Sequence, residues 1–339
     1  MLYRTALRST FAFIVMLFLS ATAHAQLFRA YLAPGGSDAN PCTLPAPCRL
    51  LPAALTAVAD GGEIWMLDSG NYNTGQVNIT KSVTILAVPG ALGSVLAAGG
   101  NAINIATAGV KVALRNLVIV PLLGGGGQNG IYMTAGAGLT LENCLIANLP
   151  GHGIYVNAGA SVRVTDTTIR DNAFAGLYLG NRSRSTVTRA TISGNTQYGV
   201  YVDGNAPSTT TTADIADSTI DANGLGVFMD SSSNAMLKVS VHDSRIVRNA
   251  NDGVRVGASG AASGDAGTLS ASNNIVANNG YGGIAVALPG NKVWASGNTV
   301  SDNYIGLYNN GGLFESAGNN AVRNNTYDTY GAITVVTTK

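Results

Sequence analysis

The chain has 339 residues, and its 19 Lys and Arg against 18 Asp and Glu give a formal net charge of +1. This even charge argues against nucleic acid or an anionic membrane as the main partner, because both call for a basic excess. A hydrophobic share of 46% excludes a mainly disordered chain, and the 43 glycines with frequent Val, Ile, Thr and Asn argue against an all-helical protein.

Residues 1–25 have the pattern of an export signal. Arg4 and Arg8 precede an uninterrupted apolar run, Phe11–Leu19, and Ala23–His24–Ala25 supplies a small-x-small cleavage pattern. The run is too short to span a bilayer, which needs about 20 residues, and no later stretch is long enough either. We therefore expect an exported protein that begins at Gln26, in the periplasm, on the cell surface or outside the cell.

Export sets the expectations for the three cysteines, because disulfides persist in oxidising compartments. Cys42 and Cys48 flank a short loop rich in proline, and we expect them to form a local disulfide. No histidine or third cysteine lies nearby, so we expect no metal site there. Cys144 occupies a repeat position otherwise held by small polar residues, and we interpret it as a buried free thiol.

Internal repeats dominate the rest of the sequence. A Gly–aliphatic–Tyr–aliphatic phrase, with variations, recurs at Gly130–Met133, Gly153–Val156, Gly176–Leu179, Gly199–Val202, Gly226–Met229, Gly253–Val256, Gly283–Val286 and Gly306–Tyr308. Between these phrases an aliphatic residue stands three positions before an asparagine, at Asn172, Asn195, Asn223, Asn249, Asn279, Asn303 and Asn325. A short alternating segment such as Val162–Val164 precedes each pair of phrases.

Each repeat thus holds three short strands and cannot bury its apolar face alone, so stacked repeats must share one core. This pattern predicts an all-β fold, a right-handed parallel β-helix with three short strands per coil and about ten coils. We expect a cap and first coil at residues 26–75 and the β-helix proper at residues 76–339. Longer turns at residues 205–212 and 257–267 are expected to protrude from one edge.

The asparagines have a structural explanation. Asn tolerates the left-handed backbone of a sharp corner, and stacked amides can donate to one coil and accept from the other. A second polar series runs beside them, at Asn143, Asp166, Asp217, Asp243 and Asn273. We interpret both series as architecture rather than chemistry.

The two ends of the solenoid differ. A short capping helix is predicted over residues 50–59, with Pro52 in its first turn and Gly61–Gly62 ending it. Its apolar face would plug the first coil and protect the strand edges there. The last strand is predicted over residues 332–337, with no clear plug after it.

The cap and the first coils resemble a known group of proteins. Residues 31–42, Pro47–Cys48–Arg49, Ala53–Ala54 and Gly61–Gly62 resemble the cap of exported bacterial right-handed β-helix repeat proteins, and Ile79–Ile85 resembles their first coils. The repeats resemble those of the pectin-lyase-like superfamily. The resemblance implies the fold over nearly the whole mature chain. It implies little about activity, because this fold carries lyases, hydrolases, epimerases, adhesins and inert stalks alike.

The catalytic motifs implied by that resemblance are not found. Pectin-degrading hydrolases of the superfamily carry Asn-Thr-Asp, Asp-Asp, Gly-His-Gly and Arg-x-Lys, of which this sequence has only Gly151–His152–Gly153. Gly153 is the repeat glycine, so we interpret His152 as incidental. The superfamily's lyases use calcium bound by Asp, and the sequence motifs of these lyases are also missing. We therefore expect no cofactor, with calcium as the alternative.

Two series should point to solvent. The middle residue of the repeated phrase faces outward, which places Tyr132, Tyr155, Tyr178, Tyr201 and Phe228 in one column on five successive coils. Such rings could bind the apolar faces of sugars, or could simply stack on one another and shield the sheet.

The second outward series contains two carboxylates. Asp203 and Asp230 should be neighbours at the ends of two strands, where they would share a proton or bind a cation. Arg182, in the preceding turn, could reach them. The alternative interpretation is ordinary solvated turn charge.

The leading hypothesis is a non-catalytic module that binds a polysaccharide or cell-surface glycan, or serves in adhesion. A polysaccharide lyase or glycoside hydrolase acting on an acidic polysaccharide through Asp203, Asp230 and Arg182 is the first alternative, and a purely structural solenoid is the second.

Overall fold

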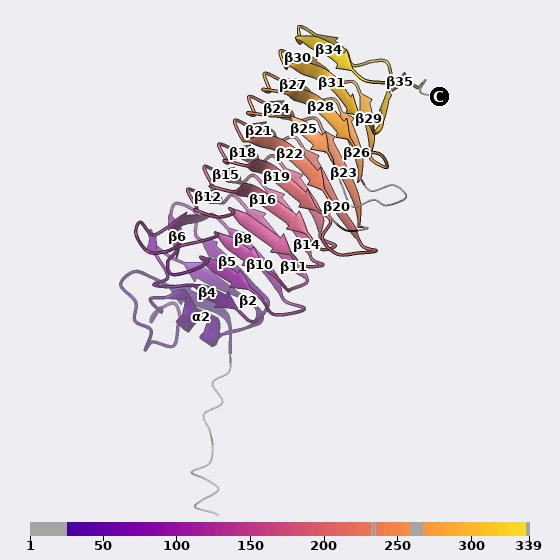
Figure 1. The fold of residues 1–339 in the computed structure, drawn as a ribbon. Helices are drawn as coiled ribbons and strands as arrows, with labels where there is room; N and C mark the ends of the chain where they lie inside the picture. Colours follow the sequence, from indigo (N-terminus) through magenta and orange to yellow (C-terminus); the bar gives the residue numbers. More distant parts are fainter. Residues whose placement is uncertain (1–25, 232, 234, 258–266, 337–339) are drawn as a thin grey trace, which may run out of the picture.

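The structure is a computed structural model that describes residues 26–336 apart from residues 232, 234 and 258–266. The expected export signal at residues 1–25, the turn at residues 258–266 and the end of the last predicted strand lie outside the described residues. The chain winds into an elongated column of stacked coils, with the N-terminal coils at one end and the C-terminal coils at the other (Figure 1).

Each coil contributes one strand to each of three parallel sheets, named sheets 1, 2 and 3 in chain order. Sheet 1 contains β1 (Leu27–Leu32), β2 (Val58–Met66), β5 (Val83–Ala87), β8 (Lys111–Arg115), β11 (Gly138–Glu142), β14 (Ser161–Thr165), β17 (Arg184–Thr188), β20 (Thr210–Ala216), β23 (Met236–His242), β26 (Gly267–Ser272), β29 (Lys292–Ser296), β32 (Leu313–Ser316) and β35 (Ile333–Val335). Sheet 2 contains β3 (Gly70–Asn71), β6 (Gly93–Ala97), β9 (Leu117–Pro121), β12 (Leu145–Ala147), β15 (Thr168–Arg170), β18 (Thr191–Ser193), β21 (Thr219–Asp221), β24 (Arg245–Val247), β27 (Ile275–Ala277), β30 (Thr299–Ser301) and β33 (Ala321–Arg323). Sheet 3 contains β4 (Val77–Ile79), β7 (Ile103–Ile105), β10 (Ile131–Met133), β13 (Ile154–Asn157), β16 (Ala175–Gly180), β19 (Tyr198–Asp203), β22 (Leu225–Asp230), β25 (Val254–Val256), β28 (Gly282–Ala287), β31 (Ile305–Asn310) and β34 (Tyr327–Tyr330).

The predicted parallel β-helix with three strands per coil is confirmed. Sheets 2 and 3 each have 11 described strands, so the column has about eleven coils, slightly more than the expected ten. The core is one continuous row of stacked aliphatic side chains. Ile154 pairs with Leu177, Leu177 with Val200 and Val200 with Val227, and all four are fully buried.

The asparagine series forms a buried ladder, as predicted. From Asn172 to Asn325, each Nδ2 donates to Oδ1 of the next asparagine at 2.8–3.1 Å, and each backbone N–H donates to the same oxygen. The left-handed backbone, however, lies one residue earlier than expected. Asp171 has φ 56° and Arg248 has φ 54°, so the corner residue bends the chain and the asparagine after it makes the hydrogen bonds.

A second ladder follows the same rule. Asn143, Asp166, Asp217, Asp243 and Asn273 all have positive φ, and the residue after each one supplies the stacked side chain. Asn274 and Asn298 pair in this way, and Ser218 and Ser244 fill the equivalent position on earlier coils. Cys144 belongs to this series as a buried free thiol, and burial raises its pKa to about 11.

The N-terminal cap contains a helix and a disulfide. Helix α2 (Leu51–Ala57) buries Leu51, Ala54 and Leu55 against the first coil. The predicted end of the helix at residue 59 is wrong, because Val58 already pairs with Leu27 at the start of β2. The predicted disulfide between Cys42 and Cys48 is confirmed. Over the part of the chain that the structure describes, no helix is long and apolar enough to cross a bilayer.

The ladder leads to a stability prediction. Asn195→Ala removes an oxygen that accepts hydrogen bonds from both the backbone N–H and the Nδ2 of Asn172, and leaves these buried donors without a partner. We expect the free energy of unfolding to fall by about 3 kcal/mol. Urea denaturation followed by circular dichroism measures the change.

Asn310→Ala is the matched control, because Asn310 is exposed at the end of β31. It should change the free energy of unfolding by less than about 0.5 kcal/mol. Equal effects of the two substitutions would contradict the importance of the ladder.

Candidate functional site

The outer face of sheet 3 carries the expected aromatic column. The strand register pairs Tyr132 with Tyr155, Tyr155 with Tyr178, Tyr178 with Tyr201 and Tyr201 with Phe228. We call these five residues the aromatic column. The same register position continues to Asn104 on one side and to Arg255, Ala285, Tyr308 and Tyr330 on the other.

The rings of the aromatic column cover one another. Tyr132 and Tyr155 are stacked with centroids 4.8 Å apart and planes at 12°, and Tyr155 stacks on Tyr178 at 4.4 Å and 14°. Tyr201 meets Tyr178 edge-on at 84° and lies nearly parallel to Phe228. Because the ring faces are turned toward their neighbours, the first half of the column presents ring edges and hydroxyls to solvent.

Tyr178 is the most enclosed ring of the aromatic column, with only 6% of its surface exposed. Its hydroxyl donates to Asp203, and Asn205 donates through Nδ2 to both the Tyr178 hydroxyl, at 3.2 Å, and Asn157 Oδ1, at 3.0 Å. The turn that begins at Asn205 therefore lies over this part of the column. Burial, with the neighbouring Asp203 carboxylate, raises the pKa of Tyr178 well above its ordinary value.

The two expected carboxylates are neighbours. Asp203 ends β19 and pairs directly with Asp230 at the end of β22, and both are half-buried. Burial raises the pKa of Asp203, the Tyr178 hydrogen bond opposes that shift and the Asp230 charge adds to it. One oxygen of Asp230, Oδ1, is buried and makes no hydrogen bond within the described structure.

Arg182 is not joined to this carboxylate pair. Its backbone N–H donates to Thr211 Oγ1, and its side chain is exposed. Among the residues that the structure describes, no hydrogen bond or ion pair connects the Arg182 guanidinium with Asp203 or Asp230. In the same part of the chain, no group of three or more His, Cys, Asp or Glu side chains is arranged to hold a metal ion.

His152 packs against the aromatic column rather than lying at random on a turn. Its ring lies 5.2 Å from Tyr155, 4.9 Å from Phe174 and 5.5 Å from Tyr178, measured between centroids. Its Nδ1 is buried with no partner among the described residues. This burial lowers the pKa of His152 to about 4, so the imidazole is neutral near pH 7.

The face of sheet 1 carries features that the sequence analysis missed. Lys111, Arg184, Lys238 and Lys292 share one register position, with small residues between them on the intervening strands. Neighbouring basic residues from Arg184 onward are two strands apart, roughly 10 Å. The unequal turn lengths hide this spacing in the sequence, and only the strand register reveals it.

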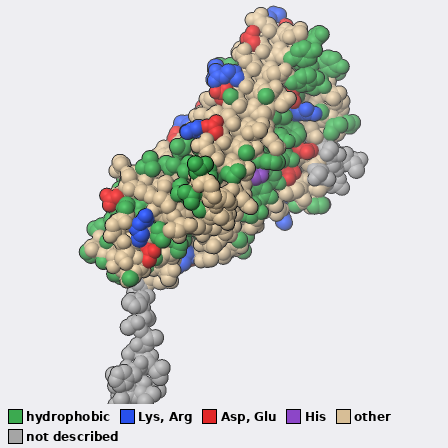
Figure 2. Space-filling model, turned by 60° about the vertical axis from the view of Figure 1, so that its left-hand side comes forward, with side chains coloured by type: hydrophobic (Ala, Val, Ile, Leu, Met, Phe, Trp, Pro, Cys, Tyr) green, Lys and Arg blue, Asp and Glu red, His purple; other side chains and the backbone are tan. Residues whose placement is uncertain are grey.

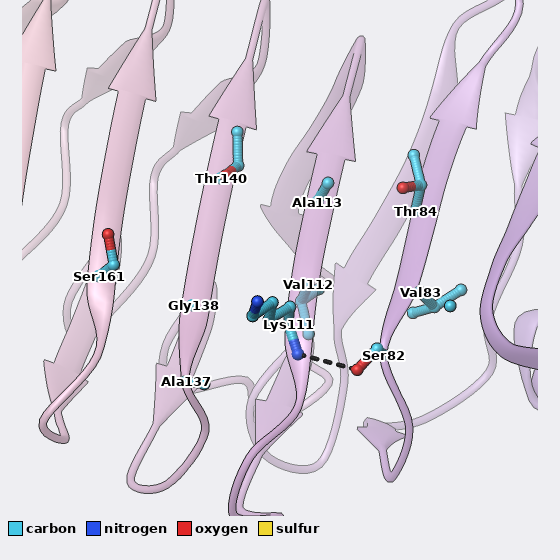
Figure 3. A pocket seen from close by; sticks show the side chains of 11 residues that line it. Ser82, Val83, Thr84, Lys111, Val112, Ala113, Ala137, Gly138, Thr140 and Ser161 are labelled. Atoms are coloured by element: carbon cyan, nitrogen blue, oxygen red, sulfur yellow. Dashed lines mark hydrogen bonds between the residues drawn. The ribbon is translucent and has the colours of Figure 1, made fainter.

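Small side chains at the N-terminal part of this face leave a shallow groove (Figure 3). Its lining residues are Gly61, Ser82, Val83, Thr84, Lys111, Val112, Ala113, Ala137, Gly138, Thr140 and Ser161. Figure 3 shows the Lys111 backbone N–H donating to Ser82 Oγ, at 3.2 Å. Further along the face, His242 lies between Asp214, at 3.4 Å, and Asp243, at 2.8 Å.

The environment of His152 predicts an acid-dependent loss of stability. Its pKa in the folded protein, about 4, lies below the ordinary value of 6.5, so the unfolded chain binds the proton more readily. The stabilisation is complete above pH 6.5 and is lost as the pH falls toward 4, by up to about 3 kcal/mol.

His152→Leu tests this prediction, because Leu225 fills the equivalent position three coils later. Urea unfolding at several pH values should show a smaller loss between pH 6.5 and 4 in the variant than in the unaltered protein. Parallel curves for the two proteins would contradict the assignment.

Comparisons with known proteins support the fold. A family model described as a right handed beta helix region matches residues 101–263. No curated protein matches the sequence.

Several solved structures are similar over most of the chain. The A-module of the mannuronan C-5 epimerase AlgE6 from Azotobacter vinelandii has a TM-score of 0.58 at 14% identity, covering 85% of this chain and 95% of that one. Pectate lyase Pel9A has a TM-score of 0.52 at 16% identity, covering 83% and 71% of the two chains. XylC, solved as a complex with xylose, has a TM-score of 0.57 at 9% identity, covering 81% and 69%.

These identities show the fold alone. Together with the family match and the three-sheet architecture, they identify the fold of the chain as a right-handed parallel β-helix, similar to the folds of pectate lyase Pel9A and the AlgE6 A-module.

Proposed function

We propose that this protein is exported and binds an extended glycan along the outer face of sheet 3, as a surface or adhesive module rather than as an enzyme. One observation carries the proposal: aromatic residues occupy the outward position on five successive strands of that face. The Cys42–Cys48 disulfide supports export, because such bonds persist in oxidising compartments. Similar folds occur in a pectate lyase, a mannuronan epimerase and a protein crystallised with xylose, which supports a saccharide ligand.

The geometry of the aromatic column specifies the contacts. Since the rings cover one another, a glycan would pack on ring edges and accept or donate hydrogen bonds at the hydroxyls of Tyr132, Tyr155 and Tyr201. Asp203 and Asp230 would accept hydrogen bonds from sugar hydroxyls, and bonds to an ionised group are stronger than neutral ones. The five rings span about 19 Å at the strand spacing, which suits an extended chain of several sugar units.

A three-residue variant tests the proposal. The combination of Tyr132→Ala, Tyr155→Ala and Tyr201→Ala removes the three half-exposed tyrosine rings of the column and leaves Phe228 and the buried Tyr178 in place. We expect affinity for the bound polysaccharide to fall by at least about tenfold, because each removed ring costs roughly 1 kcal/mol. Calorimetric titration of a panel of neutral and acidic oligosaccharides measures it, with thermal unfolding as the check on folding.

The matched control lies on the other face. Lys111→Ala, Arg184→Ala and Lys238→Ala together change three side chains of sheet 1 and leave sheet 3 untouched. This control should bind as the unaltered protein does. Loss of binding in the control with full binding in the tyrosine variant would place the ligand on sheet 1 and overturn the proposal. If nothing in the panel binds, a purely structural solenoid is favoured.

The second candidate is a lyase or hydrolase that acts on an acidic polysaccharide. The observation that favours it is the Asp203–Asp230 pair, in which one carboxyl has a raised pKa and lies beside a phenol. Carboxyl groups with shifted pKa values are suited to proton transfer. Arg182 would take part only if its exposed side chain turned toward the pair when substrate binds.

This candidate predicts cleavage of uronate polymers, to be assayed with and without added calcium. New reducing ends and unsaturated products distinguish hydrolysis from elimination, and Asp203→Asn and Asp230→Asn should each reduce the rate at least about a hundredfold. Product formation that these substitutions leave unchanged would exclude the carboxylate pair as the catalytic centre.

A further inference from the structure

A second group of aromatic residues lies on the last three coils, beyond the aromatic column. Tyr281 and Tyr304 occupy equivalent positions on successive coils, because each directly precedes one of the paired residues Gly282 and Ile305. Tyr327 lies one position further along the next coil, because it pairs with Ile305, and its N–H donates to the Tyr304 carbonyl. Tyr308 and Tyr330 lie beside them on the outer face of sheet 3. We call these five residues the tyrosine terrace.

The tyrosine terrace is open to solvent. Tyr281, Tyr304, Tyr327 and Tyr330 are 37%, 44%, 52% and 56% exposed, against 6% for Tyr178 in the aromatic column. A space-filling view shows hydrophobic side chains, the class that includes tyrosine, gathered at the C-terminal end of the molecule (Figure 2). Exposed aromatic surface of this kind marks an interaction site more often than isolated exposed residues do.

The ring orientations distinguish the terrace from the column. Three of its four ring contacts are edge-on: Tyr281 with Tyr308 and Tyr304 with Tyr327, both at 5.5 Å and 89°, and Tyr308 with Tyr330 at 5.5 Å and 61°. The fourth contact, Tyr281 with Tyr304, is stacked, with centroids 5.7 Å apart and planes at 25°. In an edge-on pair, the ring that turns its edge to its partner keeps both of its own faces uncovered, and the partner keeps one face uncovered. The terrace therefore offers ring faces, which the stacked rings of Tyr132, Tyr155 and Tyr178 do not.

Most of the charged side chains near the terrace form ion pairs or hydrogen bonds within the protein. Arg255 pairs with the buried Asp252 at 3.4 Å, and Asp328 Oδ1 accepts from the backbone N–H and Nδ2 of Asn325 at 3.3 and 3.1 Å. Asp302 is exposed at the neighbouring corner. The surface is thus apolar ring face bordered by phenol hydroxyls, with no concentration of charge of one sign.

We propose that the tyrosine terrace is a second carbohydrate-binding site, which takes uncharged sugar units by stacking their apolar faces on its rings. This inference rests on the proposed glycan-binding function and adds to it a separate place and a ligand class. A pyranose ring combines an apolar face with a rim of hydroxyls, and an exposed tyrosine offers the matching combination. Tyr308 lies six strands from Tyr155 in sheet 3, about 29 Å, so a short oligosaccharide bound at the terrace cannot contact Tyr132 or Tyr155.

The test uses uncharged trisaccharides of β-1,4-linked glucose, xylose and mannose, followed by ligand-observed NMR titration. Tyr281→Ala with Tyr304→Ala should weaken binding of the best trisaccharide by at least about tenfold. Tyr281→Phe with Tyr304→Phe keeps the ring faces and should bind within about threefold of the unaltered protein. The column variant Tyr132→Ala with Tyr155→Ala should keep trisaccharide binding.

Three results would overturn the inference. Trisaccharide binding lost in the column variant and kept in the terrace variant would leave the proposed function intact and remove the second site. No trisaccharide binding by the unaltered protein would also remove it. Sedimentation that shows a dimer converted to a monomer by Tyr281→Ala with Tyr304→Ala would assign the terrace to contact between two copies of the chain.

Discussion

The fold depends on one constraint: each coil must place its polar corner groups and apolar side chains directly against the same groups of the next coil. A single coil has too little core to be stable alone, and its strands find their hydrogen-bond partners only in its neighbours. The asparagine ladder makes this constraint specific. Since Asn172 N–H and Nδ2 both donate to Asn195 Oδ1, a shift of one residue between coils would leave two buried donors unpaired at once.

The same register creates the surfaces that the proposals use. A residue type repeated at one outward position becomes a column, and the aromatic column is the result for Tyr132 through Phe228. Register alone does not decide what a column can bind. Ring orientation does, because Tyr132, Tyr155 and Tyr178 are nearly parallel and cover one another, while three of the four ring contacts in the tyrosine terrace are edge-on and leave faces open. The two halves of sheet 3 therefore differ in the ligand surface they offer.

Much of the fold was predictable because the spacing of the repeats determines which residues stack from coil to coil. The ladder asparagines, the stacked core residues such as Ile154 and Leu177, and the exposed side of the aromatic column follow from periodicity. The end of α2 was not predictable from the sequence, because Val58 joins a strand whose partner, Leu27, is distant in sequence. Local propensity cannot show such a pairing.

The candidate site was predictable only in part. Adjacency of Asp203 and Asp230 follows from the register, whereas the position of Arg182 depends on a turn whose conformation no repeat specifies. The enclosure of Tyr178 by Asn205 depends on a lengthened turn in the same way. The basic residues of sheet 1 were missed because unequal turns conceal their common register, and the terrace was missed because Tyr281 and Tyr304 lie outside the repeated phrase.

Disulfide trapping on the outer face of sheet 1 tests the in-register stacking most directly. Thr140 and Arg163 are paired on adjacent strands, β11 and β14, so Thr140→Cys with Arg163→Cys should cross-link under mild oxidation, since paired strands lie about 4.8 Å apart. Thr140→Cys with Thr186→Cys skips one strand, roughly 10 Å, and should stay reduced. Mass spectrometry of the oxidised proteins identifies the bond. Cross-linking of the second pair in place of the first would contradict the register of the stacked coils, from which every surface described above follows.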